Sequence, residues 1–182
     1  MRLITAAFFI SVDGVVEAPQ NWHFPYLSPE MVAEVKTQQA DAGALLLGRR
    51  TYKEWAAYWP HQDPTDPLAH RLNTTPRLVA SRTLRDVTWE GSQLLEGDAV
   101  DAVGRLASED GPPIAVAGSP TLFRSLLDAG LVNELRLVVH PLFLGKGQRL
   151  FSDAGDKIAL TLQDMHLHAN GVAVLVYRPQ RN

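Results

Sequence analysis

The chain has 182 residues, 46% of them hydrophobic, which is enough for one compact domain with its own core. Its 17 Lys and Arg against 20 Asp and Glu leave a net charge of −3, which argues against a nucleic-acid partner. The absence of cysteine excludes disulfides, thiol nucleophiles, iron–sulfur clusters and cysteine-ligated zinc sites.

The sequence gives no sign of a membrane segment. No run of about 18 apolar residues is present, so we expect no membrane partner. Met1-Arg2 and the apolar residues after it resemble the start of a signal peptide, but Thr5 and Ser11 interrupt the run and no small-residue cleavage site follows. We therefore expect a cytoplasmic protein whose partner is a small-molecule substrate.

The first elements are predicted from apolar runs and helix-start signals. Residues 3–12 are almost continuously apolar, as in a strand covered on both faces. Ser28-Pro29-Glu30 combines a hydroxyl cap, a first-position proline and a first-turn acid, so a helix is expected there, ending before Gly43. Residues 44–47 form the next short buried strand.

The next stretch alternates helix and strand signals. Thr51 with Glu54 matches a capping box, which predicts a helix beginning at Thr51. Residues 61–73 are predicted to be a loop with one short helical turn near 68–72. A third strand is expected at 77–80 and ends before Ser81-Arg82.

The middle of the chain repeats the strand–helix pattern. A weak strand signal at 92–95 precedes Asp98, which is predicted to cap a helix. Residues 114–117 are a buried strand that ends in Gly118-Ser119-Pro120, where a second hydroxyl-capped helix is expected to start. Gly130 is a natural end for that helix.

The last third carries strand signals. Alternation at 134–139 and again from Ile158 to Leu162 predicts strands. Asn170-Gly171 is the strongest hairpin signal in the chain, with β-formers at 172–177 behind it. We predict an α/β fold whose sheet is mostly parallel, with an antiparallel hairpin at its C-terminal edge.

Two similar junctions suggest where a ligand binds. After Leu47 and again after Ala117, a buried strand ends in glycine, Gly48 or Gly118, and a hydroxyl residue starts a helix. Helix N-termini offer free N–H donors, so two of them at one sheet edge can hold a pyrophosphate. The alternative interpretation is that these are ordinary α/β connections.

Arginines stand beside these junctions. Arg49 and Arg50 follow Gly48, and Arg82 follows Ser81 at the end of the third strand. Their guanidinium groups suit a phosphate monoester such as the 2′-phosphate of NADPH. The alternative interpretation is that they are solvated surface arginines.

Other familiar site motifs are missing. The sequence has no G-x-G-x-x-G, no G-x-x-x-x-G-K-[ST] and no G-x-S-x-G. His166 and His168 share a face if their segment is a strand, but two histidines without a third ligand make a poor metal site. We predict no metal.

Five motifs in register resemble the dihydrofolate reductase-like superfamily, and specifically the reductase domain of bacterial riboflavin biosynthesis, the RibD C-terminal domain. They span roughly residues 3–178 and are SVDG at 11–14, GRRTY at 48–52, AGSPTL at 117–122, GLVNEL at 130–135 and PLFLGKG at 141–147. The resemblance implies a single domain over 1–182 with a three-layer α/β/α fold that binds NADPH. It also implies a homodimer, which the hydrophobic C-terminal hairpin favours because its apolar surface needs cover.

The resemblance also implies which residues bind the cofactor. Ala7 and the loop from Asp13 border the nicotinamide, and the other implied contacts are to the phosphates. The implied cofactor-binding residues are Ala7, Gly48, Arg49, Arg50, Thr51, Ser81, Arg82, Gly118, Ser119, Thr121 and Leu122.

Few residues are candidates for contact with the substrate beside the nicotinamide. Asp13 is our candidate for handling a proton or orienting the substrate, and its alternative role is that of a turn residue before Gly14. Trp22, Phe24 and Tyr52 are candidates for the wall of the substrate pocket, although ordinary packing also explains them.

The chain departs from its relatives at two places. Folate reductases resemble the WHFP stretch at 22–25 but carry an acid just beyond the proline, where this chain has Tyr26 and Leu27 and its first acid is Glu30. The riboflavin reductases usually carry an acid before the glycine pair at Gly118, where this chain has Val116-Ala117. The first departure disfavours dihydrofolate reduction, because a protonated pterin would lack its carboxylate partner.

We expect an NADPH-dependent reductase acting on a small heterocyclic or ribosyl substrate, similar to 5-amino-6-(5-phosphoribosylamino)uracil reductase. The alternative is a non-catalytic NADP(H)-binding sensor or partner-binding module.

Overall fold

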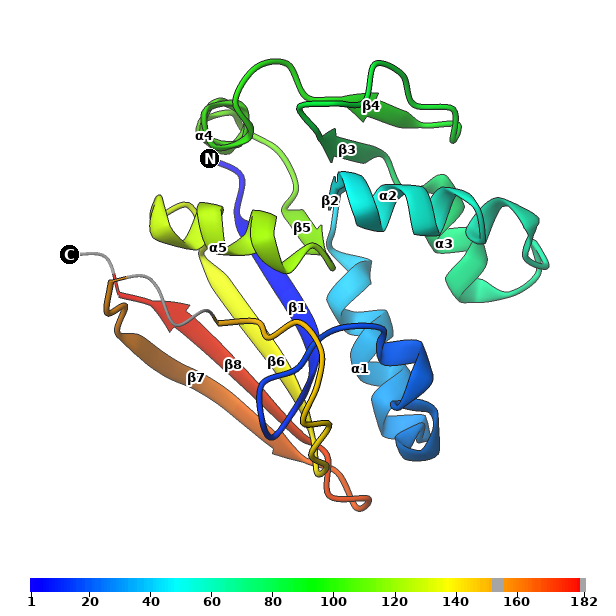
Figure 1. Ribbon diagram of the computed structural model, residues 1–182, viewed down its shortest axis with the longest axis vertical. Helices are drawn as coiled ribbons and strands as arrows, with labels where there is room; N and C mark the ends of the chain where they lie inside the picture. The colour runs from blue at the N-terminus through cyan, green and yellow to red at the C-terminus, as the bar shows by residue number, and fades with distance from the viewer. Residues whose placement is uncertain (152–155, 181–182) are drawn as a thin grey trace.

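The computed structural model describes residues 1–151 and 156–180, without the side chains of residues 37–40. The described residues form one eight-stranded sheet in the order β4-β3-β2-β5-β1-β6-β8-β7, with helices on both faces (Figure 1). The three-layer α/β/α fold class is thereby confirmed. The strands are β1 (Ile4–Ser11), β2 (Ala44–Gly48), β3 (Arg77–Ala80), β4 (Ser92–Leu94), β5 (Ile114–Ala117), β6 (Glu134–His140), β7 (Leu160–Leu167) and β8 (Ala173–Pro179).

The sheet is parallel except at its C-terminal edge. From β4 to β6 all neighbouring strands pair in parallel, whereas β8 is antiparallel to both β6 and β7. The β7–β8 hairpin turns through Asn170-Gly171, so the predicted hairpin is confirmed. β7 forms the edge of the sheet and its side chains are almost all exposed.

Five α-helices connect the strands in the described part of the chain. Asp98 caps α4 by accepting the Val100 and Asp101 amides, and the Ser28 hydroxyl accepts the Met31 amide at the start of α1, both as predicted. The helices are α1 (Pro29–Ala40), α2 (Arg49–Ala56), α3 (Pro67–Thr74), α4 (Ala99–Ser108) and α5 (Pro120–Asp128), with short 3₁₀ turns at Pro19–Asn21, Phe24–Tyr26 and Trp59–His61.

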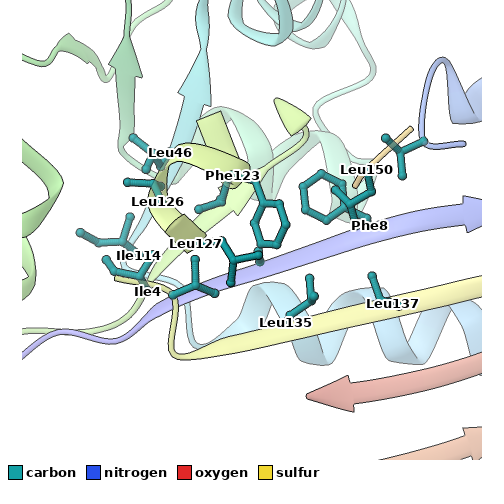
Figure 2. Close-up of a cluster of buried hydrophobic side chains, with 14 of the residues drawn as sticks. Ile4, Phe8, Leu46, Ile114, Phe123, Leu126, Leu127, Leu135, Leu137 and Leu150 are labelled. Atoms are coloured by element: carbon teal, nitrogen blue, oxygen red, sulfur yellow. The ribbon is translucent and has the colours of Figure 1, made fainter. Parts of the chain in front are cut away.

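The largest core cluster lies on the sheet face that α4 and α5 cover (Figure 2). Alternate residues of β1, including Ile4 and Phe8, point into it and meet Phe123 and Leu126 of α5. The Phe8 and Phe123 rings pack edge to face with their centroids 5.1 Å apart. Leu150, from the segment after β6, closes this cluster beside Phe8.

The opposite face carries two smaller clusters. Under α2 and α3, the buried residues are Leu45, Leu47, Tyr52, Leu72, Val79 and Trp89. Under α1, they are Met31, Val138, Val172 and Val174, with Phe9 and Tyr26 packed against them. Both faces of the central strands are thus covered, as the continuous apolar run at residues 3–12 predicts.

The carboxyl ends of the parallel strands are not level. Ala7 pairs with Ala117, the last residue of β5, and with Arg136 in β6. Beyond this point β1 and β6 continue as a pair until Ser11 meets His140. β5 therefore ends beside Ala7 while β1 and β6 continue, and the candidate site lies where the strand ends differ in this way.

Two helices differ from the predictions. α2 begins at Arg49, two residues before Thr51, because Gly48 and not Thr51 is its N-cap residue. Residues 61–73, predicted to be a loop with one turn, contain most of α3, whose N-terminus Asp66 caps through the Leu68 and Ala69 amides. The capping signal of Asp66 was present in the sequence, but the surrounding prolines and aspartates concealed it.

Arg77 is a buried cation at the start of β3, only 1% exposed. Its guanidinium donates to the carbonyls of Leu72, Thr75 and Glu90 and to the hydroxyl of Ser92. It also lies over the Trp89 ring, 4.0 Å from its centre. These bonds replace hydration and tie the end of α3 to the turn before β4, although burial still lowers the pKa of the group.

We predict that Arg77→Met lowers the free energy of unfolding by about 2–4 kcal/mol, because it strands several buried acceptors at once. Urea denaturation followed by circular dichroism measures the change, with the exposed Arg85 as the matched control in Arg85→Met. Equal unfolding midpoints for the two variants would show that Arg77 adds nothing to the fold.

Candidate functional site

The helices that follow β2 and β5 diverge to opposite faces of the sheet, although the two strands are parallel neighbours. α2 packs through Tyr52 on the face with Leu45 and Leu47, whereas α5 packs through Phe123 on the other face. In open α/β sheets, ligands bind at the carboxyl ends of strands where the connections diverge in this way. The two glycine junctions singled out in the sequence meet at this point.

The two glycines are required because the junctions touch each other. A Cβ on Gly48 would lie 2.9 Å from the Ser119 hydroxyl oxygen. A Cβ on Gly118, which has φ +58°, would lie 3.0 Å from the Thr51 methyl group. A side chain on either glycine would therefore push α2 and α5 apart.

The Ser119 hydroxyl joins the two junctions. It accepts the Gly48 amide at 2.7 Å and lies 2.8 Å from the Thr51 hydroxyl. Ser119 adopts a left-handed conformation (φ 58°) and its side chain does not cap α5, so the predicted hydroxyl cap is wrong there. The side chain is instead committed to a contact across the switch point.

As a result, the first turns of both helices keep open N–H donors. Neither α2 nor α5 has a side-chain cap bond. Thr121 and Leu122 follow Pro120 in the first turn of α5, and Gln148 and Arg124 contact the Thr121 hydroxyl at 3.3 and 3.4 Å. Uncapped N-termini favour an anion.

The three candidate arginines differ in their surroundings. Arg50 is exposed and forms ion pairs with Glu54 at 3.2 Å and Glu17 at 3.4 Å. Arg49 instead donates to the Thr83 hydroxyl at 2.9 Å, and no carboxylate of the described residues pairs with it. Arg50 is therefore partly neutralised by its neighbours, whereas Arg49 presents an uncompensated charge.

Arg82 lies close to Arg49 along the sheet edge. Gly48 pairs with Ala80, so the residues after β2 and β3 follow neighbouring strand ends. Ser81 caps the turn after β3 by accepting the Thr83 and Leu84 amides. Arg82 is exposed and has no partner within 1–151 and 156–180.

Asp13 lies just beyond β1 and is held by several donors. Its two oxygens accept the Ser11 hydroxyl at 2.6 Å and the amides of Leu144 and Gly145 at 3.1 and 2.8 Å, with Arg149 at 3.5 Å. These donors, the Ser11 hydroxyl first, lower the pKa of Asp13 to about 2. Asp13 is thus ionised at neutral pH and has no proton to donate; whether it orients a substrate stays a prediction.

Asp13 and Glu17 join the segment after β1 to the segment after β6. Val15 and Arg149 form an antiparallel bridge, and the Gln148 amide donates to Glu17 at 2.8 Å. Because Glu17 also pairs with Arg50, these two joined segments reach from the end of β1 to the start of α2.

The three aromatic residues predicted to line the substrate pocket lie in two different places. Trp22 and Phe24 lie in one segment beside the end of β1, Trp22 buried and Phe24 60% exposed. Tyr52 is 4% exposed, and its hydroxyl accepts the Thr88 and Trp89 amides, so packing under α2 already explains it. Trp22 and Phe24 stay predictions as pocket residues.

Glu30, the first acid after residues 22–25, is not a buried carboxylate of the kind that engages a pterin. Glu30 is exposed, and the Ser28 hydroxyl lowers its pKa, with a smaller contribution from His168. Met31, which follows it, is fully buried among apolar residues. Folate reduction stays disfavoured.

Several polar residues escaped the sequence analysis. Arg136 of β6 pairs with Glu34 of α1 at 2.5 Å and with Glu134 at 3.3 Å, beneath α1 and next to Ala7 in register. His140 ends β6 and is completely buried. The alternation of Leu135, Leu137 and Val139 places Arg136 and His140 on the other face of β6 but does not indicate that this face is buried.

The remaining histidines do not gather around a common point. His166 is exposed and lies 3.0 Å from Asp164, whereas His168 is buried in the hairpin turn. No group of three potential metal ligands occurs among the described residues. Nor does any helix there have the length and apolar character of a membrane span.

Comparison with known proteins agrees with this fold. The model of the RibD C-terminal domain family matches residues 2–176. The chain belongs to the RibD C-terminal domain family. It is 26% identical to the uncharacterized protein YyaP of Bacillus subtilis (strain 168), over 97% of this chain and 94% of YyaP.

Two solved structures show the same fold. A putative riboflavin biosynthesis protein from Shewanella sp. PV-4 superposes with a TM-score of 0.77 at 17% identity, covering 98% of this chain and 99% of that one. A deaminase/5-amino-6-(5-phosphoribosylamino)uracil reductase from Thermotoga maritima gives 0.69 at 13% identity, covering 98% of this chain and 57% of that one. The family suggests a reductase-like role.

We predict that Asp13→Asn releases the segment after β6, because one amide cannot satisfy all the donors that the carboxylate accepts. Hydrogen exchange at the Leu144 and Gly145 amides should rise by about tenfold. The wild-type protection should persist at every pH above about 4 and weaken only as the pH falls toward about 2, since the folded pKa is lowered.

Asp63→Asn is the matched control, because Asp63 likewise accepts an amide and a hydroxyl, both from Thr65, in a different loop. Unchanged exchange at Leu144 and Gly145 in Asp13→Asn would refute the anchoring role.

Proposed function

We propose that this protein is an NADPH-dependent reductase that transfers a hydride to a small heterocyclic or ribosyl substrate. The observation that carries the proposal is the switch point itself. Two uncapped helix N-termini, of α2 and α5, meet there beside Arg49, whose charge no described carboxylate compensates. A dinucleotide carries negative charge at the places where such an edge is positive.

The pyrophosphate in the middle of the cofactor fits the two glycine junctions. Gly48, Thr51, Gly118, Thr121 and Leu122 would surround it, with amide donors from both first turns. Ser119 would act by holding the junctions together, because its hydroxyl is already bonded to Gly48 and Thr51.

The 2′-phosphate end matches the ends of β2 and β3. Arg49, Ser81 and Arg82 follow these neighbouring strands, and Arg49 is already oriented by Thr83. Arg50 contributes less, since Glu17 and Glu54 share its charge. A preference for NADPH over NADH follows from this arrangement.

The nicotinamide end belongs at Ala7, where β5 ends while β1 continues. NADPH supplies a hydride when bound, and the protein's own task is to place it against the substrate and exclude water. Asp13 serves this task by fixing the segment around residues 144–149 at the same edge. The name of the Thermotoga protein supports a substrate resembling an aminouracil riboside.

A second candidate function is NADP(H) binding without turnover, as a sensor or partner-binding module. The observation that favours it is the absence of two acids: Tyr26 and Leu27 stand where folate reductases carry one, and Val116-Ala117 where the riboflavin reductases usually do. Consumption of reduced nicotinamide with panels of pyrimidines, pterins and ketones separates the two: turnover of any one substrate establishes the reductase.

We predict that Arg49→Ala and Arg82→Ala each raise the Kd for NADPH by about tenfold or more, while the Kd for NADH changes less than about twofold. The reason is that only NADPH carries the phosphate these groups would bind. Nicotinamide fluorescence on titration measures both constants, and equal losses for the two cofactors would contradict the assignment.

Two further variants calibrate this measurement. Arg178→Ala removes an exposed arginine of β8 and should leave both constants unchanged. Ser119→Ala should weaken NADPH and NADH to the same extent, because it loosens the junctions that both pyrophosphates would use.

We also propose a homodimer formed through β7. This edge strand exposes Leu162, Met165 and Leu167 by 49%, 59% and 73%, and no helix of the described chain covers it. Contiguous exposed apolar surface at a sheet edge favours association.

The double variant Met165→Glu/Leu167→Glu is predicted to convert a dimer into a monomer in light scattering coupled to size-exclusion chromatography. Leu68→Glu, at an exposed apolar residue of α3, is the control and should stay dimeric. A wild-type monomer at micromolar concentration would refute the proposal.

A further inference from the structure

His140 lies at the carboxyl end of β6 and is completely buried. Its Nδ1 lies 2.9 Å from the Val138 carbonyl, which can only accept, so Nδ1 carries the proton and Nε2 is a bare acceptor. Nε2 is buried and has no hydrogen-bond partner in the described residues. Such a group lowers stability by about 1–3 kcal/mol, so its presence requires an explanation.

The ring is enclosed by aromatic side chains, most of them from the segment 19–26. Trp22 and Tyr26 meet it edge to face, with centroids 5.1 and 5.5 Å away, and Phe9 of β1 does the same at 5.4 Å. His23, from the same segment, is 6.4 Å away and stacks on Phe9 at 4.9 Å. His140, together with Phe9, is therefore the part of the sheet that the segment 19–26 packs against.

His23 has the same peculiarity as His140. Its Nδ1 is also buried without a partner in the part of the chain that the structure describes. Two neighbouring imidazoles thus each hold an unpaired nitrogen inside one aromatic cluster. His140 is completely buried and His23 is half-buried, so the cluster favours the neutral form of both rings.

A proton on either ring would be an uncompensated charge. The ionisable groups that face His140 are His23 and Tyr26, and no carboxylate of the described residues bonds or ion-pairs with either imidazole. From β1 the ring meets Phe9 and the Ile10 carbonyl, and from β6 the Val138 carbonyl; neither carbonyl carries a full charge that would balance a proton. Burial accordingly lowers the pKa of both histidines, and the neighbouring His23 lowers that of His140 further, against the Val138 and Ile10 carbonyls, which raise it.

The segment 19–26 is connected to the candidate site. The Trp22 indole donates to the Glu17 carbonyl at 2.9 Å. The Glu17 carboxylate in turn binds the Gln148 amide and Arg50 at the start of α2. A displacement of Trp22 therefore reaches the groups at the strand ends through one residue.

We propose that His140 is a positioning residue: as a neutral imidazole it holds the Trp22–Tyr26 segment against the sheet, and uptake of one proton by the His23–His140 pair releases that segment. The inference goes beyond the proposed reductase activity and does not depend on it.

The direction of the pH effect follows from linkage. In the held state both histidines have pKa values below the ordinary value of about 6.5, which they regain on release. The held state is then fully stable above about pH 6.5 and loses stability as the pH falls through the window below it. Each pH unit within the window changes the ratio of held to released segment by up to about tenfold.

The first test is nitrogen-detected NMR of the histidine side chains in the wild-type protein without ligand. At about pH 8, His140 should show the Nδ1–H tautomer with Nε2 unprotonated, and its titration midpoint should lie below about 6.5. The Nε2–H tautomer, or a midpoint at or above that value, would overturn the proposal.

The second test follows hydrogen exchange in the segment as the pH is lowered. After correction for intrinsic rates, exchange at the Tyr26 and Leu27 amides, which close the turn at Phe24–Tyr26, should rise by up to about tenfold per pH unit below about 6.5. His140→Phe keeps a ring in place and removes the proton site, so it should abolish most of this rise. An unchanged rise in His140→Phe would overturn the proposal.

Two variants keep this test decisive. His70→Gln removes an exposed histidine of α3 and should retain the wild-type pH response. If His140→Phe does not fold by circular dichroism, His23→Phe replaces it, and a wild-type response in that variant, together with an unshifted His140 titration, counts against the pair.

Discussion

The candidate site depends on the close contact between two strand–helix junctions at the ends of β2 and β5. The contact is possible because Gly48 and Gly118 have no side chains, and the Ser119 hydroxyl then bonds across the gap to Gly48 and Thr51. A hydroxyl used in this way cannot cap α5. One interaction therefore sets the spacing of the two helices and also leaves their first N–H groups open to an anion.

Features encoded by neighbouring residues could be predicted from the sequence. The apolar run at 3–12, the cap at Asp98 and the turn at Asn170-Gly171 each depend on a few adjacent positions, and each is found where expected. The mostly parallel direction of the strands followed from the alternation of strand and helix signals. For the same reason the two glycine junctions could be recognised as a pair before their contact was known.

Features that depend on distant partners could not be predicted. The Thr51 hydroxyl matches a helix cap locally, but it bonds to Ser119, 68 residues further along the chain, and α2 starts without it. Arg77 begins a strand that the sequence predicts, but its acceptors come from α3 and from the turn before β4, which no local pattern connects to it. His140 was overlooked because alternation in β6 marks only the apolar face, and nothing local tells that the other face is buried under α1 and the segment 19–26.

The strand ends form an edge of contrasting polarity, and this contrast orients the proposed ligand. Toward β3 lie Arg49 and Arg82, cations that no described carboxylate compensates. Toward β6 lie Asp13, whose charge is already bonded to the protein, and His140, which its cluster holds neutral. NADPH, with its 2′-phosphate at one end and an uncharged reduced nicotinamide at the other, would match this edge in one direction only, with the 2′-phosphate toward β3 and the nicotinamide toward β1 and β6. The opposite direction would bury a phosphate beside an ionised carboxylate and leave the arginines unpaired.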